Sequence, residues 1–214
     1  IMIITLRDAK ASASIDTLGA QLVSYKDSSG REYIWQRDPN FWGSCSPILF
    51  PIVGALRDGH TMIEGQIYEI PKHGFVKTSE LAAEQPGPNR AVFTLLDSES
   101  TRSMYPFPFL LEVTYALTDG ILSMSCLVEN TGTDRLPYFI GTHPRFICPL
   151  FEGESFEDYV LEFDEEETEG YRSYNMTRRE FDLSRRLPFP GDGKRIPLSY
   201  ELFLSDAIWF DVPR

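Results

Sequence analysis

The chain has 214 residues, of which 42% are hydrophobic and 24% are charged, and this composition indicates a globular protein and excludes a disordered or fibrous one. This length suffices for one large hydrophobic core, so we expect a single domain over residues 1–214. The net charge of −12 would repel a polyanion, which argues against a nucleic-acid partner.

Short stretches of alternating apolar and polar residues predict β-strands along the chain. Single strands are expected at Ile3 to Leu6, Ala13 to Ile15, Gln21 to Tyr25, Ala91 to Leu95 and Tyr159 to Phe163. The clearest signal is a hairpin that joins residues 111–117 to residues 121–128 through Thr118-Asp119-Gly120, because Asp and Gly tolerate the positive φ of a tight turn. A weaker hairpin joins residues 62–64 to residues 67–70 about Gly65-Gln66.

Long helices are not expected. No segment carries apolar residues at helical spacing over several turns, and 15 prolines interrupt the candidates. Many short strands with frequent turns predict an all-β fold, a sandwich of packed sheets. The acidic run from Asp164 to Glu169 is expected to be a solvated loop, because adjacent carboxylates repel one another.

The cysteines and the apolar segments point to the cytoplasm. Cys45, Cys126 and Cys148 are odd in number and lack C-x-x-C spacing, so we expect buried thiols in a reducing compartment. The opening apolar residues 1–4 are too few for a signal-peptide core, and no run is long enough to span a membrane. We therefore expect a cytoplasmic protein with no membrane partner.

Two of the three histidines lie among glycine, proline and aromatic residues, in residues 72–77 and 141–146. Imidazole can donate or accept a proton near neutral pH, and a neighbouring Phe can lie under the apolar face of a sugar. His73 and His143 are therefore the candidate catalytic residues, although each could instead be a hydrogen-bonded structural histidine. A third segment of interest is the apolar run of residues 47–59, which predicts a buried strand followed by a loop.

Several of these segments match a known family in order along the chain. They are Leu18-Gly19-Ala20-Gln21-Leu22, Tyr33-Ile34-Trp35, Pro47 to Gly54, His73-Gly74-Phe75, Gly141-Thr142-His143-Pro144, Cys148-Pro149-Leu150, Gly153-Glu154, Phe156-Glu157-Asp158-Tyr159 and Leu161-Glu162-Phe163. Together they resemble the aldose 1-epimerase (galactose mutarotase-like) family, and within it the LacX-related branch. The resemblance extends from the start of the chain to about Asp211.

The resemblance implies a galactose mutarotase-like β-sandwich of large antiparallel sheets. It also implies a cofactor-free and metal-free isomerase whose partner is a small sugar, and which interconverts the α and β anomers of a hexose. A base takes the proton of the anomeric hydroxyl while an acid protonates the ring oxygen; the ring opens, and closure on the other face reverses both transfers.

The same resemblance assigns roles to individual residues. His143 would be the general acid at the ring oxygen, and His73 would bind a hydroxyl or stabilise developing charge. Lys72, Lys77 and Asp206 match positions that contact the sugar in related proteins. The alternatives are plain surface charge for the lysines and a turn or capping residue for Asp206.

Several positions depart from the family pattern. Ala55 stands where the branch usually has arginine, and Arg57 could replace it if the backbone is extended there, since alternate side chains on a strand share a face. Lys77 replaces an arginine and lacks its bidentate geometry. Arg145 replaces a small residue and adds a cation. No residue, Glu201 included, matches the family's glutamate base, so we expect a truncated chain that lacks its C-terminal strands.

Three alternatives stay open. A hexose-6-phosphate mutarotase would use the cations Arg57, Lys72 and Lys77. A non-catalytic carbohydrate-binding or sugar-sensing domain on the same fold is favoured by the unmatched base, because function depends on the site and not on the fold. A metal enzyme would use His73, His143 and Cys148, although their spacing matches no familiar zinc pattern.

Overall fold

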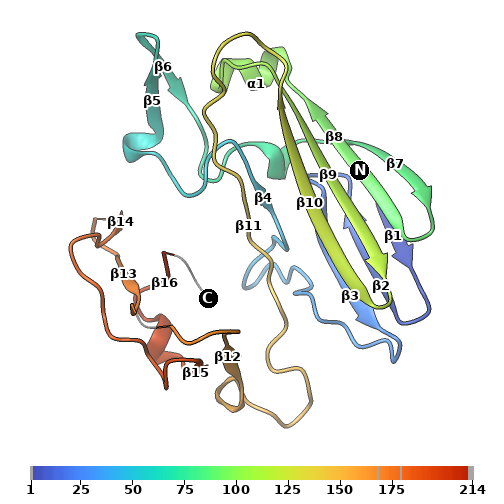
Figure 1. Cartoon of the computed structure of the whole chain (residues 1–214), viewed down its shortest axis with the longest axis vertical. Helices are drawn as coiled ribbons and strands as arrows, with labels where there is room; N and C mark the ends of the chain where they lie inside the picture. Colours follow the sequence, from blue (N-terminus) through green and yellow to red (C-terminus); the bar gives the residue numbers. More distant parts are fainter. Residues whose placement is uncertain (1, 168, 179, 212–214) are drawn as a thin grey trace. The chain divides into compact units, whose positions relative to one another are not determined.

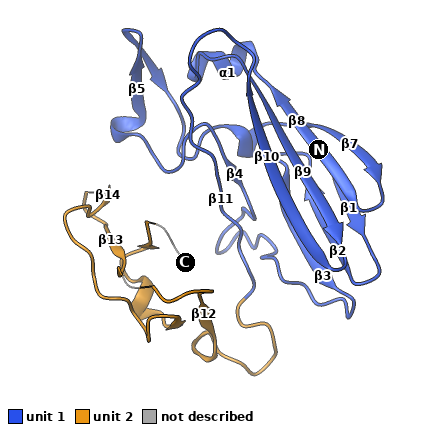
Figure 2. Ribbon diagram, in the orientation of Figure 1, with its two compact units in different colours: residues 1–147 blue, residues 148–214 orange. Residues whose placement is uncertain are grey.

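The computed structural model describes residues 2–167, 169–178 and 180–211 (Figure 1). The chain divides into two compact units, Ile1–Ile147 and Cys148–Arg214, and each is described by itself (Figure 2). The expectation of a single domain stays a prediction. Strands are the main regular structure of both units, as the sequence predicts.

Two antiparallel sheets form most of the first unit. The three-stranded sheet has the order β1-β2-β3 and consists of β1 (Ile3–Arg7), β2 (Ala11–Asp16) and β3 (Gln21–Asp27). The four-stranded sheet has the order β10-β9-β8-β7 and consists of β7 (Ala82–Gly87), β8 (Arg90–Leu96), β9 (Phe109–Thr118) and β10 (Ile121–Asn130). The strands predicted at residues 3–6, 13–15, 21–25 and 91–95 are therefore confirmed, with longer bounds.

The core of the first unit lies between these two sheets. Alternate residues of β9 are buried from Phe109 to Leu117, as expected for a strand with one face toward a core. Residues of β1 and β2 belong to the same buried cluster, so the sheets pack face to face. The Tyr115 hydroxyl donates a hydrogen bond to the Ala20 carbonyl oxygen at 2.8 Å, and both groups are buried. The predicted packing of sheets is thus present in this unit.

Shorter elements complete the first unit. They are β4 (Ile48–Leu49), β5 (His60–Ile63), β6 (Gln66–Glu69), β11 (Gly141–Thr142), the 3-10 helices η1 (Arg57–Gly59) and η2 (Val76–Thr78), and α1 (Glu99–Met104). The helix α1 has fewer than two turns and begins at a capping box in which the Ser98 and Thr101 side chains each bond the other's backbone amide. This short α-helix agrees with the expectation that the chain has no long helices.

Both predicted hairpins form, but one of them turns at a different place. The β9–β10 hairpin turns at Asp119 and Gly120, which have φ of 56° and 79°. The β5–β6 hairpin turns at Glu64 and Gly65, with φ of 50° and 81°, and Gln66 already pairs with Ile63. The expected Gly65-Gln66 turn is wrong by one residue, because glycine takes the second positive-φ position and not the first.

The second unit contains shorter strands. β12 (Val160–Glu162) pairs with β15 (Arg195–Pro197), and β13 (Arg172–Asn175) lies between β14 (Glu180–Phe181) and β16 (Ile208–Trp209). The 3-10 helices η3 (Phe156–Asp158) and η4 (Glu201–Phe203) complete it. Its packing includes three mutually contacting aromatic rings, those of Phe163, Phe189 and Phe210.

The acidic run from Asp164 to Glu169 is not exposed throughout, as the sequence had predicted for a solvated loop. In the acidic run, Asp164, Glu165, Glu166 and Glu169 are exposed, but Glu167 is buried, and its backbone amide donates to the Gly193 carbonyl oxygen at 2.6 Å; residue 168 lies outside the described residues. Glu167 is therefore the exception in this run, since its backbone pairs with the segment at Gly193 and its side chain is buried.

The three cysteines are free, but they are not equally buried. Cys45 is fully buried, whereas Cys126 and Cys148 are half-buried. Cys126 lies on the edge strand β10, where a side chain has a neighbouring strand on one side only. Within the described part of the chain, no helix is long and apolar enough to cross a membrane.

Candidate functional site

Residues 47–54 form a scaffold to which both candidate histidines are attached. β4 lies in this segment and pairs antiparallel with β11, so that Leu49 faces Gly141. His143 follows β11 directly, and its backbone amide donates to the Pro47 carbonyl oxygen at 3.1 Å. The buried strand predicted at the start of residues 47–59 is present as the two-residue β4, and the segment positions His143 through the main chain.

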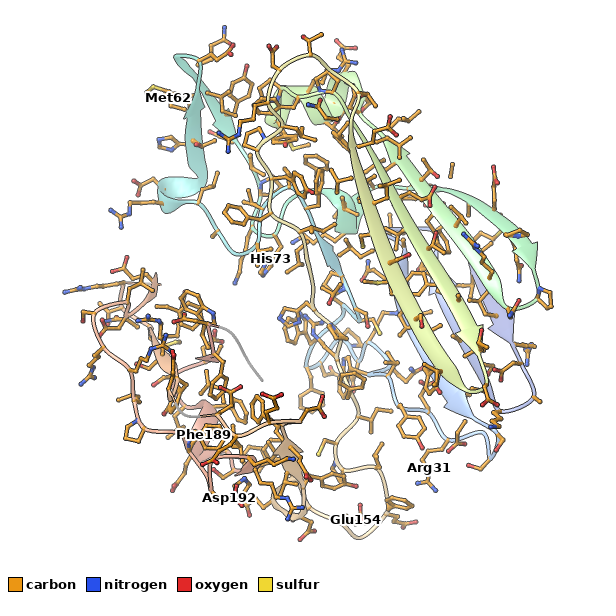
Figure 3. The ribbon with its side chains drawn as sticks, in the orientation of Figure 1. Arg31, Met62, His73, Glu154, Phe189 and Asp192 are labelled. Carbon is orange, nitrogen blue, oxygen red and sulfur yellow. The ribbon has the colours of Figure 1, made fainter. Side chains whose placement is uncertain are left out.

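The same scaffold holds His73, on the loop after β6 (Figure 3). Phe50 and Gly74 form a parallel bridge, and the Phe75 amide donates to the Phe50 carbonyl oxygen at 3.1 Å. Two bonds then join His73 to Gly54: the His73 amide donates to the Gly54 carbonyl oxygen at 2.7 Å, and the Gly54 amide donates to His73 Nδ1 at 3.0 Å. The imidazole is therefore fixed as well as the backbone.

These bonds determine the tautomer of His73. Because Nδ1 accepts a hydrogen bond, the single proton of the neutral ring resides on Nε2. Burial, and then the positive charges of Lys72 and Lys77, lower the pKa of His73 to about 4. At neutral pH, His73 is thus an uncharged imidazole that can donate a hydrogen bond from Nε2.

The two imidazoles lie against each other. Their ring centroids are 6.1 Å apart and the rings meet edge to face. His143 also meets the Trp42 ring edge to face, with centroids 5.4 Å apart. The structure therefore brings together the two histidines predicted as catalytic residues, and adds an aromatic neighbour that the sequence reasoning did not include.

Cations surround this pair. The Lys77 Nζ atom donates to the Lys72 carbonyl oxygen at 2.8 Å, so both predicted lysines lie beside the histidine loop. Arg145 also acts on His73, and burial lowers the pKa of Arg145 to about 10, which leaves its guanidinium charged at neutral pH. This positive region contrasts with the overall charge of −12.

An aromatic cleft of about 410 Å³ lies next to His143. Its lining consists of Trp35, Phe41, Trp42, Arg145 and Phe146. The Trp35 indole N–H donates to the Trp42 carbonyl oxygen at 2.8 Å, and the Arg145 guanidinium lies over the Trp42 ring. Arg145 Nη1 donates to the Ser44 carbonyl oxygen at 2.7 Å, which holds the side chain in the cleft wall.

Arg57 lies two residues after Ala55, at the start of a 3-10 helix. Arg57 is exposed and begins the 3-10 helix η1, and the following Asp58 has a φ of 57°. Leu56, which lies between Ala55 and Arg57, has an extended backbone with φ of −73° and ψ of 148°. That Arg57 replaces an arginine at position 55 stays a prediction.

Asp206 lies in the second unit, apart from the histidine scaffold in the chain. It is exposed, has a φ of 72°, and its amide donates to the Phe203 carbonyl oxygen at 3.0 Å after η4. This is the geometry of a turn residue, which agrees with the alternative reading of Asp206. Its expected contact with a sugar stays a prediction.

Metal ligation has little geometric support. Among the residues that the structure describes, no three His, Cys, Asp or Glu side chains converge in a way that could hold a metal ion. The alternative built on His73, His143 and Cys148 therefore gains no support from the arrangement of these ligands.

Phe41 and Trp42 are the cleft residues that the sequence reasoning missed. They lie outside regular strands and helices, where alternation says nothing about exposure. The available signal was the density of aromatic residues at positions 33, 35, 41 and 42, just before the scaffold. Large aromatic side chains in a loop indicate a contact surface more often than a core.

Comparison with known proteins identifies similar chains. The model of the family described as "Aldose 1-epimerase" matches residues 2–211. The plasmid-encoded protein LacX of Lactococcus lactis subsp. lactis is 38% identical over 98% of this chain and 72% of its own length, and the chromosomal LacX gives the same values.

Two solved structures are also similar. A galactose mutarotase related enzyme from Lactobacillus acidophilus has a TM-score of 0.89 and 31% identity, over 97% of this chain and 68% of that one. A galactose mutarotase-like protein from Lactobacillus casei has a TM-score of 0.82 and 29% identity, over 94% of this chain and 69% of that one. These similarities confirm the expected galactose mutarotase-like β fold.

Replacing Gly74 with alanine tests the scaffold. A Cβ atom at Gly74 would lie 1.9 Å from the Phe50 carbonyl oxygen, and the residue has a φ of +72°. We expect Gly74→Ala to lower the free energy of unfolding by more than about 2 kcal/mol, as measured by urea denaturation. Gly30→Ala is the matched control, because Gly30 has a φ of +86° but nothing within 4 Å of the added Cβ. Equal losses in the two variants would contradict the close approach at Phe50.

The protonation of His73 gives a second prediction. NMR titration of the His73 ring protons is expected to show a midpoint near pH 4, and Lys72→Gln should raise it by removing a nearby positive charge. The unfolded pKa is about 6.5, so between the two values the unfolded chain binds more protons and stability rises with pH. The pH dependence of unfolding between pH 4 and 6.5 should therefore weaken in His73→Gln. A His73 midpoint above 6 would contradict the lowered pKa of this imidazole.

Proposed function

Because the chain belongs to the aldose 1-epimerase family, we propose that it is an isomerase that interconverts the α and β anomers of a hexose. The observation that supports this most is the pairing of His143 with a neutral, main-chain-anchored His73, with ring centroids 6.1 Å apart. The reaction breaks and re-forms one carbon–oxygen bond with two proton transfers and no change of oxidation state, so acid and base groups suffice for the proposed chemistry.

His143 is the proposed general acid. It gives a proton to the sugar ring oxygen as the bond between that oxygen and the anomeric carbon breaks, while a base removes the proton of the anomeric hydroxyl. The product is the open-chain aldehyde. After rotation about the bond next to the aldehyde, the ring oxygen attacks the other face, returns its proton to His143, and the base returns the other proton.

His73 is proposed to bind the sugar and not to transfer protons. Its Nδ1 already accepts from Gly54, so only the Nε2–H is available, and it can donate to a sugar hydroxyl or to developing negative charge. The low pKa keeps the ring neutral, which makes His73 a dipolar donor and not a competing acid. We assign the base to no described residue of this chain.

A hexose 6-phosphate is a second candidate substrate, and the cations beside His73 favour it. Lys72, Lys77 and Arg145 all act electrostatically on this imidazole. A phosphate there would gain charge-assisted hydrogen bonds. The free cysteines support a cytoplasmic setting, where such phosphates would be encountered.

A non-catalytic sugar-binding or sugar-sensing domain is the second candidate function. Ala55, which stands where related proteins usually have an arginine, and the unmatched base favour it. Binding through His73, His143 and the aromatic cleft would not require a base. Catalysed anomer exchange would therefore distinguish the isomerase from the non-catalytic domain.

Replacing His143 tests the proposed acid. Anomer exchange of freshly dissolved α-glucose and α-galactose, followed by polarimetry or NMR, should exceed the buffer rate, and His143→Gln should lower kcat about 10²- to 10⁴-fold. His60→Gln is the control, because His60 is exposed on β5, outside this site. Sugar binding without exchange above the buffer rate would favour the sensing domain instead.

The phosphate candidate has its own measurement. If a hexose 6-phosphate is the substrate, kcat/KM should be higher for glucose 6-phosphate than for glucose. In the variant with both Lys72→Gln and Lys77→Gln, kcat/KM should fall about tenfold or more for the phosphate alone. Equal rates for both sugars, with equal losses in that variant, would leave the free hexose as the substrate class.

A further inference from the structure

Arg145 fastens the loop that carries Trp42 to the segment that carries His143. Its guanidinium lies over the Trp42 ring, and its Nη1 donates to the Ser44 carbonyl oxygen at 2.7 Å. Its carbonyl oxygen accepts from the Trp35 amide at 2.9 Å, so the backbone at position 145 is paired as well. Arg145 follows His143 by two residues. One residue therefore contacts the loop while its own backbone stays close to the proposed acid.

The loop of residues 38–44 leaves the direction of the Trp42 ring open. It lies outside regular strands and helices, and the amides of Phe41 and Trp42 both donate to the Asp38 carbonyl oxygen, at 3.1 and 2.8 Å. These bonds, and the one from the Trp35 indole to the Trp42 carbonyl oxygen, hold the backbone and not the ring. Trp42 is 51% exposed, so burial holds its ring weakly. The direction of this ring therefore depends on the side chains that contact it.

The Trp42 ring in turn limits how the His143 ring can lie. The amide of His143 is bonded to Pro47, which fixes the backbone only. Its imidazole meets two rings, that of Trp42 with centroids 5.4 Å apart and that of His73 with centroids 6.1 Å apart. His73 is itself bonded to Gly54 through backbone and ring. Of the two neighbours of the imidazole, the Trp42 ring is thus the one that needs a further support.

A guanidinium group suits this task. It is planar, so it can stack on an indole ring while its edge directs N–H groups to an acceptor. Arg145 uses both properties, on the Trp42 ring and on the Ser44 carbonyl oxygen. Burial lowers its pKa to about 10, which keeps the charge that attracts the ring at neutral pH. The compact ammonium of a lysine could not make both contacts at once.

We propose that Arg145 is a positioning residue for His143, which holds the Trp42 ring against the imidazole and so sets the direction in which the acid presents its proton. This inference rests on the proposed isomerase function. Arg145 acts through Trp42 and takes no part in the proton transfers. A misdirected acid slows the breaking of the ring bond and leaves sugar binding largely intact, so the effect falls on kcat and not on KM.

A double-mutant cycle tests this path. Arg145→Gln should lower kcat for the anomer exchange of α-glucose about tenfold and leave KM within about twofold. Trp42→Leu should lower kcat by a similar factor, and the variant with both changes should be no slower than either alone, because the two residues act through one contact. Arg145→Lys keeps the charge but should lose as much kcat as Arg145→Gln. Arg135→Gln is the matched control, because Arg135 is exposed after β10 and does not line the aromatic cleft.

A second measurement does not depend on turnover. The ring current of Trp42 shifts the NMR signals of the His143 ring protons. These signals should therefore move in Arg145→Gln in the same direction as in Trp42→Leu, and they should stay in place in Arg135→Gln. The backbone amide spectra of the same samples show that each variant is folded.

Three results would overturn the inference while the isomerase function stands. They are His143 signals that stay in place in Arg145→Gln, kcat losses that multiply in the double variant, and an unaltered kcat in Arg145→Lys. If the unaltered protein exchanges anomers no faster than buffer, the isomerase function fails separately. The His143 signals then decide alone whether Arg145 positions this ring: a shift in Arg145→Gln supports it, and unchanged signals overturn it.

Discussion

Backbone hydrogen bonds along residues 47–54 hold the two histidines in place. The carbonyl oxygen of Pro47 accepts from His143, and Gly54 exchanges two bonds with His73. Phe50, between them, is fully buried and contacts other aromatic rings of the core. The loops that carry the imidazoles are thus tied through one segment to the buried core of the unit, which is the usual arrangement for loop residues that carry function.

The environment that anchors His73 also sets its protonation. Partial burial and nearby cations disfavour the imidazolium, and the Gly54 amide selects the tautomer with its proton on Nε2. His143 lacks such a main-chain bond to its ring among the contacts of the described residues. The environments of the two imidazoles therefore differ, although their sequence contexts are similar.

The aromatic cleft extends this site along the surface of the first unit. Its walls come from the segment before the scaffold and from the residues after His143, so the scaffold supports the cleft and the histidines together. Trp42 contributes to both, since it contacts His143 with its ring and carries Arg145 over one face. The imidazoles and the aromatic rings of the cleft are therefore neighbouring parts of one surface.

The sequence by itself determined most strands of the first unit and the β9–β10 hairpin, and it singled out His73 and His143 as candidates, because alternation, turn chemistry and short motifs depend on neighbouring residues. Only the tertiary structure decided that the two rings meet, that His73 is neutral, that Arg57 begins a 3-10 helix, and that Phe41 and Trp42 line a cleft. These features arise where segments distant in sequence pack together. Burial and long-range hydrogen bonds control them, and no local pattern encodes such contacts.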